Sequence, residues 1–157
     1  CTIANYWNNS FRQFPSLLLN NFRETEDAIL LFDLTEANFN NCIIYGNDNP
    51  EFILDEVADP GNMFNFKFIN SLVRFQDPNN NFSDDNYDFD NVTHYENMRF
   101  NNDPDFKNVR NNEMIIGLDS GAINFGANPF SNNVPEDILT INRTAAPDAG
   151  AYQHTEF

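Results

Sequence analysis

The sequence predicts an all-β protein in which short strands stack on one another as a solenoid. One observation is a repeated phrase: Phe39–Tyr45 reads FNNCIIY, Phe68–Arg74 reads FINSLVR, and Tyr95–Phe100 is a weaker third copy. The copies begin 29 and 27 residues apart, a spacing typical of stacked repeats. The other is that each copy is a short apolar run bounded by turn-forming residues, as strands are. A single copy cannot bury both faces, so stacking copies about 4.8 Å apart would build the core.

One asparagine holds the same place in each copy: Asn41, Asn70 and Asn97. A side-chain amide in a stack can donate to the copy on one side and accept from the copy on the other. We therefore expect an asparagine ladder inside the stack. Because asparagine is common throughout the chain, chance alignment is the alternative.

Composition restricts the function classes. The 157 residues suffice for one domain with a sizeable core. Acidic residues outnumber basic ones 24 to 8, and the net charge of -16 repels phosphate backbones and anionic membrane surfaces. We expect no nucleic-acid partner, and no transmembrane segment because no run reaches the roughly 18 apolar residues that a span needs. The wealth of Asn and Asp with few Lys favours an extracellular setting.

The first elements follow from the phrase and its flanks. Cys1–Ala4 reads as the end of an earlier copy, so we expect the chain to be a piece of a larger protein. Residues 5–14 form a turn-rich connector. Residues 15–21 and 50–55 are expected to be equivalent strands, one after each of the first two copies.

The later elements are less regular. Residues 22–36 fit either a short helix with acids in its first turn or a strand. Phe64–Phe68 alternates strictly, which places its three phenylalanines on one face of a strand. Residues 76–91 are a long polar loop, and strands resume near Tyr95 and at 113–116.

The two cysteines hold equivalent places. Cys1 could instead be the lipidated first residue of a lipoprotein, but its neighbours fit the strand phrase better. Cys42 follows the ladder position, where Ser71 and Met98 stand in later copies. Parallel stacking suits neighbouring thiols better than a disulfide does, so we expect Cys1 and Cys42 to be free and buried.

Several motifs near the end of the chain carry a family resemblance. They are DPDF at 103–106, SGAINFG at 120–126, Arg143 and PDAGAY at 147–152, and NCIIYG at 41–46 is a related segment. Together they resemble the C-terminal coils of right-handed parallel β-helix proteins of the pectate-lyase-like superfamily, in a secreted or surface group of Gram-negative bacteria. The sequence departs at Gly121, where the family usually has Pro, and at Gln153, where it usually has Glu.

The resemblance implies a right-handed parallel β-helix that ends in a C-terminal cap. Residues 1–118 would form the coils, with the acidic loop at about 76–91, and residues 119–157 the last coil and cap. It also implies secretion, or a place on the cell surface or outer membrane.

The cap residues are expected to be architectural. Gly126 and Gly150 suit tight turns, and the ring of Tyr152 would cover the last layer. Asp137, Arg143 and Asp148 would form a charge-assisted network that holds the cap in place.

Residue types suited to catalysis are present without a clear pattern. His94 and His154 lack the partners of a serine-type triad, and with the cysteines they lack zinc-ligand spacing. Polysaccharide hydrolysis needs paired carboxylates, and elimination needs Ca²⁺ with a basic side chain. The residues of these types are Asp55, Glu56, Lys67 and Arg74. The alternative is that they form a solvated charged face.

Calcium is the one cofactor hypothesis. Asp84, Asn86, Asp88 and Asp90 are spaced two apart, like the first ligands of a Ca²⁺ loop, but the glycine and distal glutamate of an EF-hand are missing. An acidic solvated loop is the alternative.

For function, we expect a non-catalytic protein that binds a glycan or an envelope protein through a solenoid face. The alternative is a polysaccharide lyase or hydrolase whose active centre lies mostly outside this segment. The fold alone does not separate the two. The lack of a convergent acid–base cluster favours the first.

Overall fold

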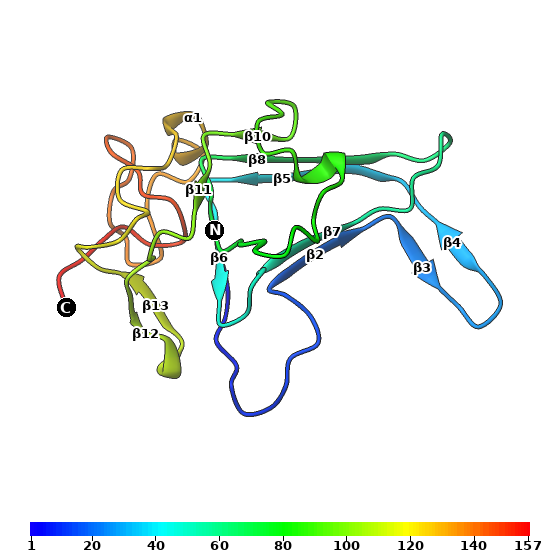
Figure 1. Cartoon of the computed structure of the whole chain (residues 1–157). Helices are drawn as coiled ribbons and strands as arrows, with labels where there is room; N and C mark the ends of the chain where they lie inside the picture. The colour runs from blue at the N-terminus through cyan, green and yellow to red at the C-terminus, as the bar shows by residue number, and fades with distance from the viewer.

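The computed structural model describes residues 1–157, whose short strands form five small sheets (Figure 1). The strands are β1 (Thr2–Asn5), β2 (Leu17–Asn20), β3 (Phe22–Glu24), β4 (Ile29–Leu31), β5 (Leu34–Asn40), β6 (Ile43–Gly46), β7 (Phe52–Asp55), β8 (Phe64–Ile69), β9 (Leu72–Val73), β10 (Tyr95–Glu96), β11 (Arg99–Phe100), β12 (Phe106–Asn108) and β13 (Glu113–Ile116). The helices are η1 (Asp85–Tyr87), η2 (Val109–Asn111) and α1 (Asn128–Ser131). Three sheets are parallel, with the orders β1-β6-β9-β11, β10-β8-β5 and β2-β7. The pairs β3-β4 and β12-β13 are antiparallel.

The repeated phrase forms a corner between two sheets. Asn41, Asn70 and Asn97 have φ angles of 52°, 49° and 51°, in the left-handed region that asparagine tolerates better than most residues. Each lies between a strand of the three-stranded sheet and a strand of the four-stranded sheet. After the corner the copies lie side by side, with Ile43 opposite Leu72.

Aromatic side chains fill the space between the three parallel sheets. Phe68 is fully buried, and its ring stacks on Phe39 at a centroid distance of 4.7 Å and on Tyr95 at 5.8 Å. Phe64 and Phe66 are also buried, which confirms the face predicted from the alternation in β8. This stack gives the core its large apolar area.

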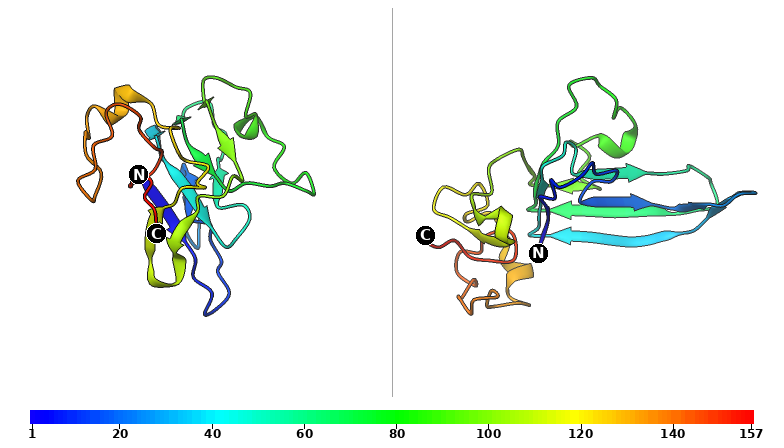
Figure 2. Two further views of the ribbon diagram at one scale, coloured as in Figure 1. Left: turned by 90° about the vertical axis from the view of Figure 1, so that its left-hand side faces the viewer. Right: turned by 90° about the horizontal axis from the view of Figure 1, so that it is seen from below.

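The C-terminal part of the chain packs on the outer face of the four-stranded sheet. Ile43 and Leu72 contact Ile116 and Phe125 there, whereas Ile44 points into the aromatic core. Successive side chains on a strand face opposite ways, so β6 is buried on both faces. The views in Figure 2 show this C-terminal region, yellow to red, beside the parallel strands.

The expected right-handed parallel β-helix is wrong, and so is the implied family resemblance. The strands are divided among separate sheets of two to four strands, two of them antiparallel, without the continuous stacking of a solenoid. Residues 119–157 therefore cap no solenoid end; they lie against the side of a sheet. The copies of the phrase specify a strand, a corner and a strand, but the segments between them differ too much to build a repeat architecture.

Residues 22–36 contain one of these irregular segments. They form the antiparallel hairpin β3–β4 and the start of β5, so the strand alternative was correct and the helix was not. The hairpin stands away from the body of the molecule (Figure 1).

None of the helices has the length and apolar character needed to cross a membrane.

Candidate functional site

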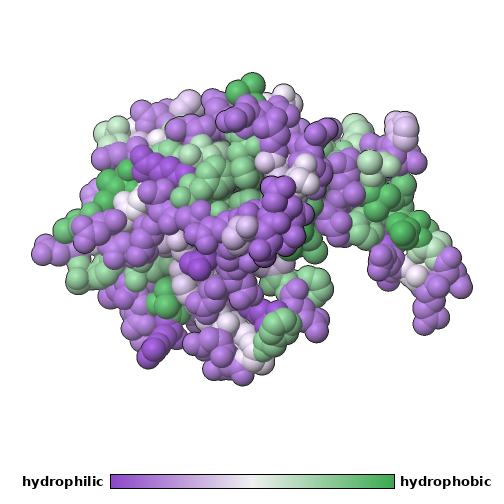
Figure 3. Space-filling view, viewed as in Figure 1, coloured by the Kyte–Doolittle hydropathy of each residue, from purple (hydrophilic) through white to green (hydrophobic).

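The loop between β1 and β2, residues 6–16, exposes the most aromatic surface, and we call it the aromatic loop. Trp7, Phe11 and Phe14 are 54%, 91% and 65% exposed. In Figure 1 this loop extends from the lower edge of the molecule, and in Figure 3 hydrophobic side chains show there among polar ones. Because a group of exposed apolar rings is unfavourable in water unless it serves an interaction, this loop is the strongest candidate site.

Trp7 stands between two grooves. The loop groove, of about 500 Å³, lies between the aromatic loop and the turn 47–50. The hairpin groove, of about 660 Å³, lies between the start of the loop and η2, where Arg110 lines it. Trp7, Asn8 and Asn47 line both. We call the two grooves together the Trp7 cleft.

A buried ion pair anchors the aromatic loop to the body. Glu51 is fully buried, and its carboxylate accepts hydrogen bonds from Arg12 Nη2 at 2.6 Å, from the Ser16 amide at 2.9 Å and hydroxyl at 2.8 Å, and from the Asp48 amide at 2.7 Å. Arg12 also donates to the Asn5 carbonyl at 2.6 Å. Its Nε lies 2.8 Å from Asp48 Oδ2, an ion pair without hydrogen-bond geometry. A buried carboxylate persists only with such partners, so this cluster holds the loop in one position.

The indole of Trp7 is oriented by its own hydrogen bonds. Its Nε1 donates to Ser10 Oγ at 3.0 Å, and its backbone N–H donates to Asn5 Oδ1 at 3.1 Å. The polar edge of the ring is thus occupied by the loop itself.

The cleft carries little net charge in a strongly acidic protein. The hairpin groove is lined by one cation, Arg110, and by no acid. The only acid lining the loop groove is Asp48, which is paired with Arg12. Burial, aided by the nearby Tyr45 and Asp103, raises the pKa of Tyr6 well above its usual range, so Tyr6, which lines the hairpin groove, stays neutral. Aromatic faces, amides and hydroxyls therefore dominate the surface.

The asparagines expected to form a ladder instead bond to the C-terminal segment. The Asn41 amide donates to the Ala127 carbonyl and to Ser131 Oγ, both at 3.1 Å, and accepts from the Ala127 amide at 2.8 Å. Asn70 donates to the Phe125 carbonyl at 2.8 Å. The Asn97 side chain is exposed and makes no hydrogen bond. The three amides are not bonded to one another.

The acidic loop uses its predicted Ca²⁺ ligands for local turns. Asp84 caps η1 by accepting from the Asn86 amide at 3.0 Å, and Asp88 accepts from the Asp90 amide at 3.2 Å. The Asn86 side chain donates to Glu56 at 2.8 Å. No group of three or more His, Cys, Asp or Glu side chains in the chain is arranged to hold a metal ion.

The candidate polysaccharide-cleaving residues do not converge. Asp55 and Glu56 line a groove of about 330 Å³ with the acidic loop. Lys67 pairs with Glu96 at 3.4 Å, and Arg74 lies over the Tyr45 ring at 5.6 Å.

The two histidines also lie apart. His94 stacks on Phe66 at 4.3 Å, and His154 Nδ1 lies 2.8 Å from the buried Asp148.

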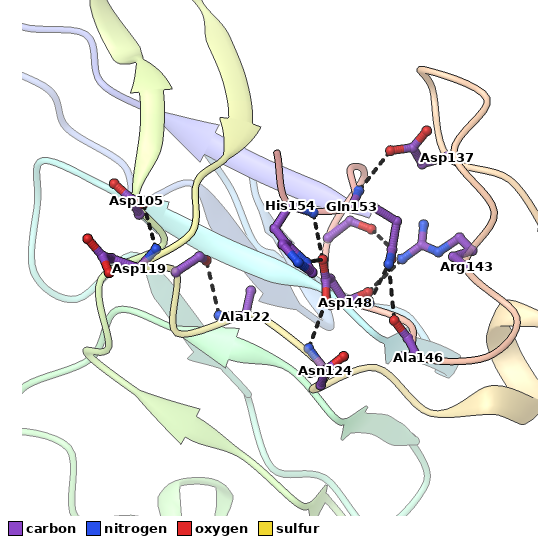
Figure 4. A network of polar contacts seen from close by, with 12 residues as sticks. Asp105, Asp119, Ala122, Asn124, Asp137, Arg143, Ala146, Asp148, Gln153 and His154 are labelled. Atoms are coloured by element: carbon purple, nitrogen blue, oxygen red, sulfur yellow. Dashed lines mark hydrogen bonds and ion pairs between the residues drawn. The ribbon is translucent and has the colours of Figure 1, made fainter. Parts of the chain in front are cut away.

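The C-terminal residues expected to form a cap network are close together (Figure 4). Asp148 accepts from the Asn124 and His154 amides, both at 2.7 Å. Arg143 donates to the carbonyls of Asp148 at 2.6 Å and Gly150 at 3.1 Å, not to a carboxylate.

The same region contains a second buried acid and is bonded to the corner at Asn41. Asp137 accepts from the Gln153 amide at 2.7 Å. The Gly150 amide donates to the Asn41 carbonyl at 2.8 Å, the Gly126 amide to Pro147 at 2.8 Å, and Tyr152 is half-buried nearby. These bonds fold the C-terminal segment back on itself.

Both cysteines are free, but their exposure differs. Cys42 is buried as expected, whereas Cys1 is exposed, which corrects the expectation of two buried thiols.

The sequence predicts only a turn-rich connector at residues 5–14, which lie largely in this aromatic loop. Its signal was present in the single Trp of the chain and in two further aromatic residues within eight positions of a polar stretch, WNNSFRQF. The residues that line the cleft from outside the loop, such as Asn47 and Arg110, could not be found in this way, because they come from distant parts of the chain.

No protein-family model, curated protein or solved structure matches this chain.

Proposed function

We propose that the protein is a non-catalytic carbohydrate-binding protein and that the Trp7 cleft is its binding site. The observation that carries this proposal is the set of three exposed rings on a loop held by a buried ion pair, beside grooves lined by asparagines.

The chemistry of the cleft matches that of a sugar chain. A pyranose ring presents a face of C–H groups, which packs on an aromatic face, and a rim of hydroxyls, which need both donors and acceptors. Asparagine amides supply both at one side chain. Asn8 and Asn47 lie beside Trp7 in both grooves.

The shape and charge of the cleft also favour this ligand. The two grooves share Trp7, Asn8 and Asn47, which would let a linear chain place successive sugars on both sides of the indole. The volumes of about 500 and 660 Å³ lie within the range of about 300–1,000 Å³ typical of ligand sites. The acid at the site, Asp48, is engaged by Arg12, which supports binding over acid–base chemistry.

Binding is tested by co-sedimentation with insoluble polysaccharides and by gel retardation with soluble ones, neutral and acidic, each with and without Ca²⁺. The expected result is retention by at least one polysaccharide and a loss of retention of about tenfold or more in Trp7→Ala, since covering the apolar face of a large side chain is worth about 1.5–3 kcal/mol. Phe32→Ala is the matched control, because Phe32 is also 54% exposed but lies after the distant β3–β4 hairpin.

Two results would contradict the proposal. Equal retention of wild type and Trp7→Ala would place binding elsewhere. New reducing ends or unsaturated products in the supernatant would show that the protein cleaves the chain. Circular dichroism of each variant confirms that the fold is retained.

A further inference from the structure

Each of the three parallel sheets ends, on one side, in a strand whose outer edge is unpaired. β1, β2 and β5 lie at the ends of their sheets and pair only with β6, β7 and β8, respectively. β6 and β8 each have a second partner on the opposite side, β9 and β10. The three free edges therefore lie on the same side of the consecutive strands β6, β7 and β8. We call them the open edge.

The apolar core continues to the open edge and stops there uncovered. Phe39 of β5 lies opposite Phe68 of β8, yet Phe39 is only partly buried while Phe68 is fully buried. Leu19 of β2 is likewise only partly buried, whereas its partner Leu54 in β7 is 5% exposed. Phe68 has an aromatic ring stacked on each face, whereas Phe39 has one only. One more layer would bury these side chains as the inner residues are buried.

The protein covers the opposite edge of β7 with its own chain. On that side the Tyr87 hydroxyl accepts from the Leu54 amide at 2.8 Å and donates to the Leu54 carbonyl at 3.2 Å. A free strand edge is a template for pairing with another chain. The contrast makes the open edge a surface available for a partner.

The charge of the surface selects the kind of partner. Glu36 is exposed on β5, and its carboxylate is bonded to Asn38 on the same face. A second copy of this chain would bring another Glu36 and a charge of -16 to the contact, which is repulsive. Within the protein the strand beside β5 is β8, whose Lys67 lies opposite Asn38 and is its only charge.

We propose that the free edge of β5 binds an extended polypeptide strand. This strand has an apolar side chain at every second position on one face and a basic side chain on the other face. Backbone hydrogen bonds along the seven residues of β5 supply the attraction, and the alternate apolar side chains cover Phe39 and its neighbours. The basic side chain lies on the outer face near Glu36.

The test uses a labelled peptide with the sequence of Phe64–Asn70, FNFKFIN, blocked at both ends, because this is the strand that pairs with β5 on its other edge. Fluorescence anisotropy should show saturable binding to the whole protein. A peptide with Lys67→Glu should bind roughly tenfold more weakly. The Glu36→Lys protein should reverse this preference, and since Glu36 is exposed this variant should fold normally.

Three results would overturn the proposal: no saturable binding, equal binding of both peptides to both proteins, or sedimentation showing a dimer that excludes the peptide. The first two would remove the strand partner, and the third would assign the open edge to a second copy. None of these results depends on whether the Trp7 cleft binds a carbohydrate.

Discussion

Replacing Glu51 with alanine should destabilise the protein by about 3–5 kcal/mol, the usual cost of removing one partner of a buried ion pair. The carboxylate is fully buried and accepts four hydrogen bonds, from Arg12, Ser16 (two) and the Asp48 amide. Without it, the Arg12 guanidinium, whose side chain is 9% exposed, retains Asp48 and the Asn5 carbonyl but loses its buried counterion.

The assay is urea unfolding followed by circular dichroism, with the free energy of unfolding taken by linear extrapolation. The control is Glu96→Ala, which removes an exposed ion pair to Lys67 and should cost about 1 kcal/mol or less. The Glu51→Ala protein should also bind polysaccharide more weakly than wild type at temperatures where it is folded, because the aromatic loop loses its anchor. A loss of less than about 1 kcal/mol for Glu51→Ala, or equal losses for both variants, would refute this reasoning.

Three further outcomes are expected. Asn41→Gly keeps the left-handed corner but removes three side-chain hydrogen bonds, so it should lower the free energy of unfolding by about 2 kcal/mol. Asn97→Gly, at an equivalent corner without such bonds, should change it by less than about 0.5 kcal/mol. Equal effects of the two variants in the urea assay would disprove this role of Asn41. Burial raises the pKa of Tyr87 from 10.0 to about 12, so its neutral form stabilises the fold fully below pH 10, and this contribution should be lost as the pH rises toward 12. The part of the absorbance rise at 295 nm that wild type shows and Tyr87→Phe lacks should then coincide with unfolding, and such a rise near pH 10 with the fold intact would contradict it. A thiol reagent should modify Cys1 rapidly in the native protein and Cys42 only after unfolding; two rapid modifications would show that Cys42 is not buried.

Local patterns in the sequence were sufficient to place most strands. Phe64–Phe68 shows why: strict alternation leaves one arrangement that buries every aromatic ring, and the structure has it. The sequence shows that the Asn position is repeated, but the predicted hydrogen bonds from one copy's amide to the next are wrong. A sequence does not show whether a repeated amide bonds to its neighbour copies or to a distant segment, and the partner of Asn41 is 86 residues away.

The sheets and the candidate site also depend on contacts between residues that are far apart in the sequence. The hairpin β3–β4 and the loop 76–91 interrupt the strands in ways that a spacing of 27 to 29 residues does not reveal. The aromatic loop could have been found from its composition. Its grooves could not, because they require the turn at Asn47 and the hairpin at Arg110 to meet it in space.

Trp7 is the only tryptophan of the chain, so intrinsic fluorescence reports directly on the cleft. The most direct measurement is a titration of the protein with soluble oligosaccharides prepared from a polysaccharide that retains it. The predicted result is a saturable shift of the emission to shorter wavelength, as a sugar ring displaces water from the indole, with a weaker affinity in Phe11→Ala. Saturable binding by calorimetry with unchanged Trp7 emission would contradict the assignment of this cleft.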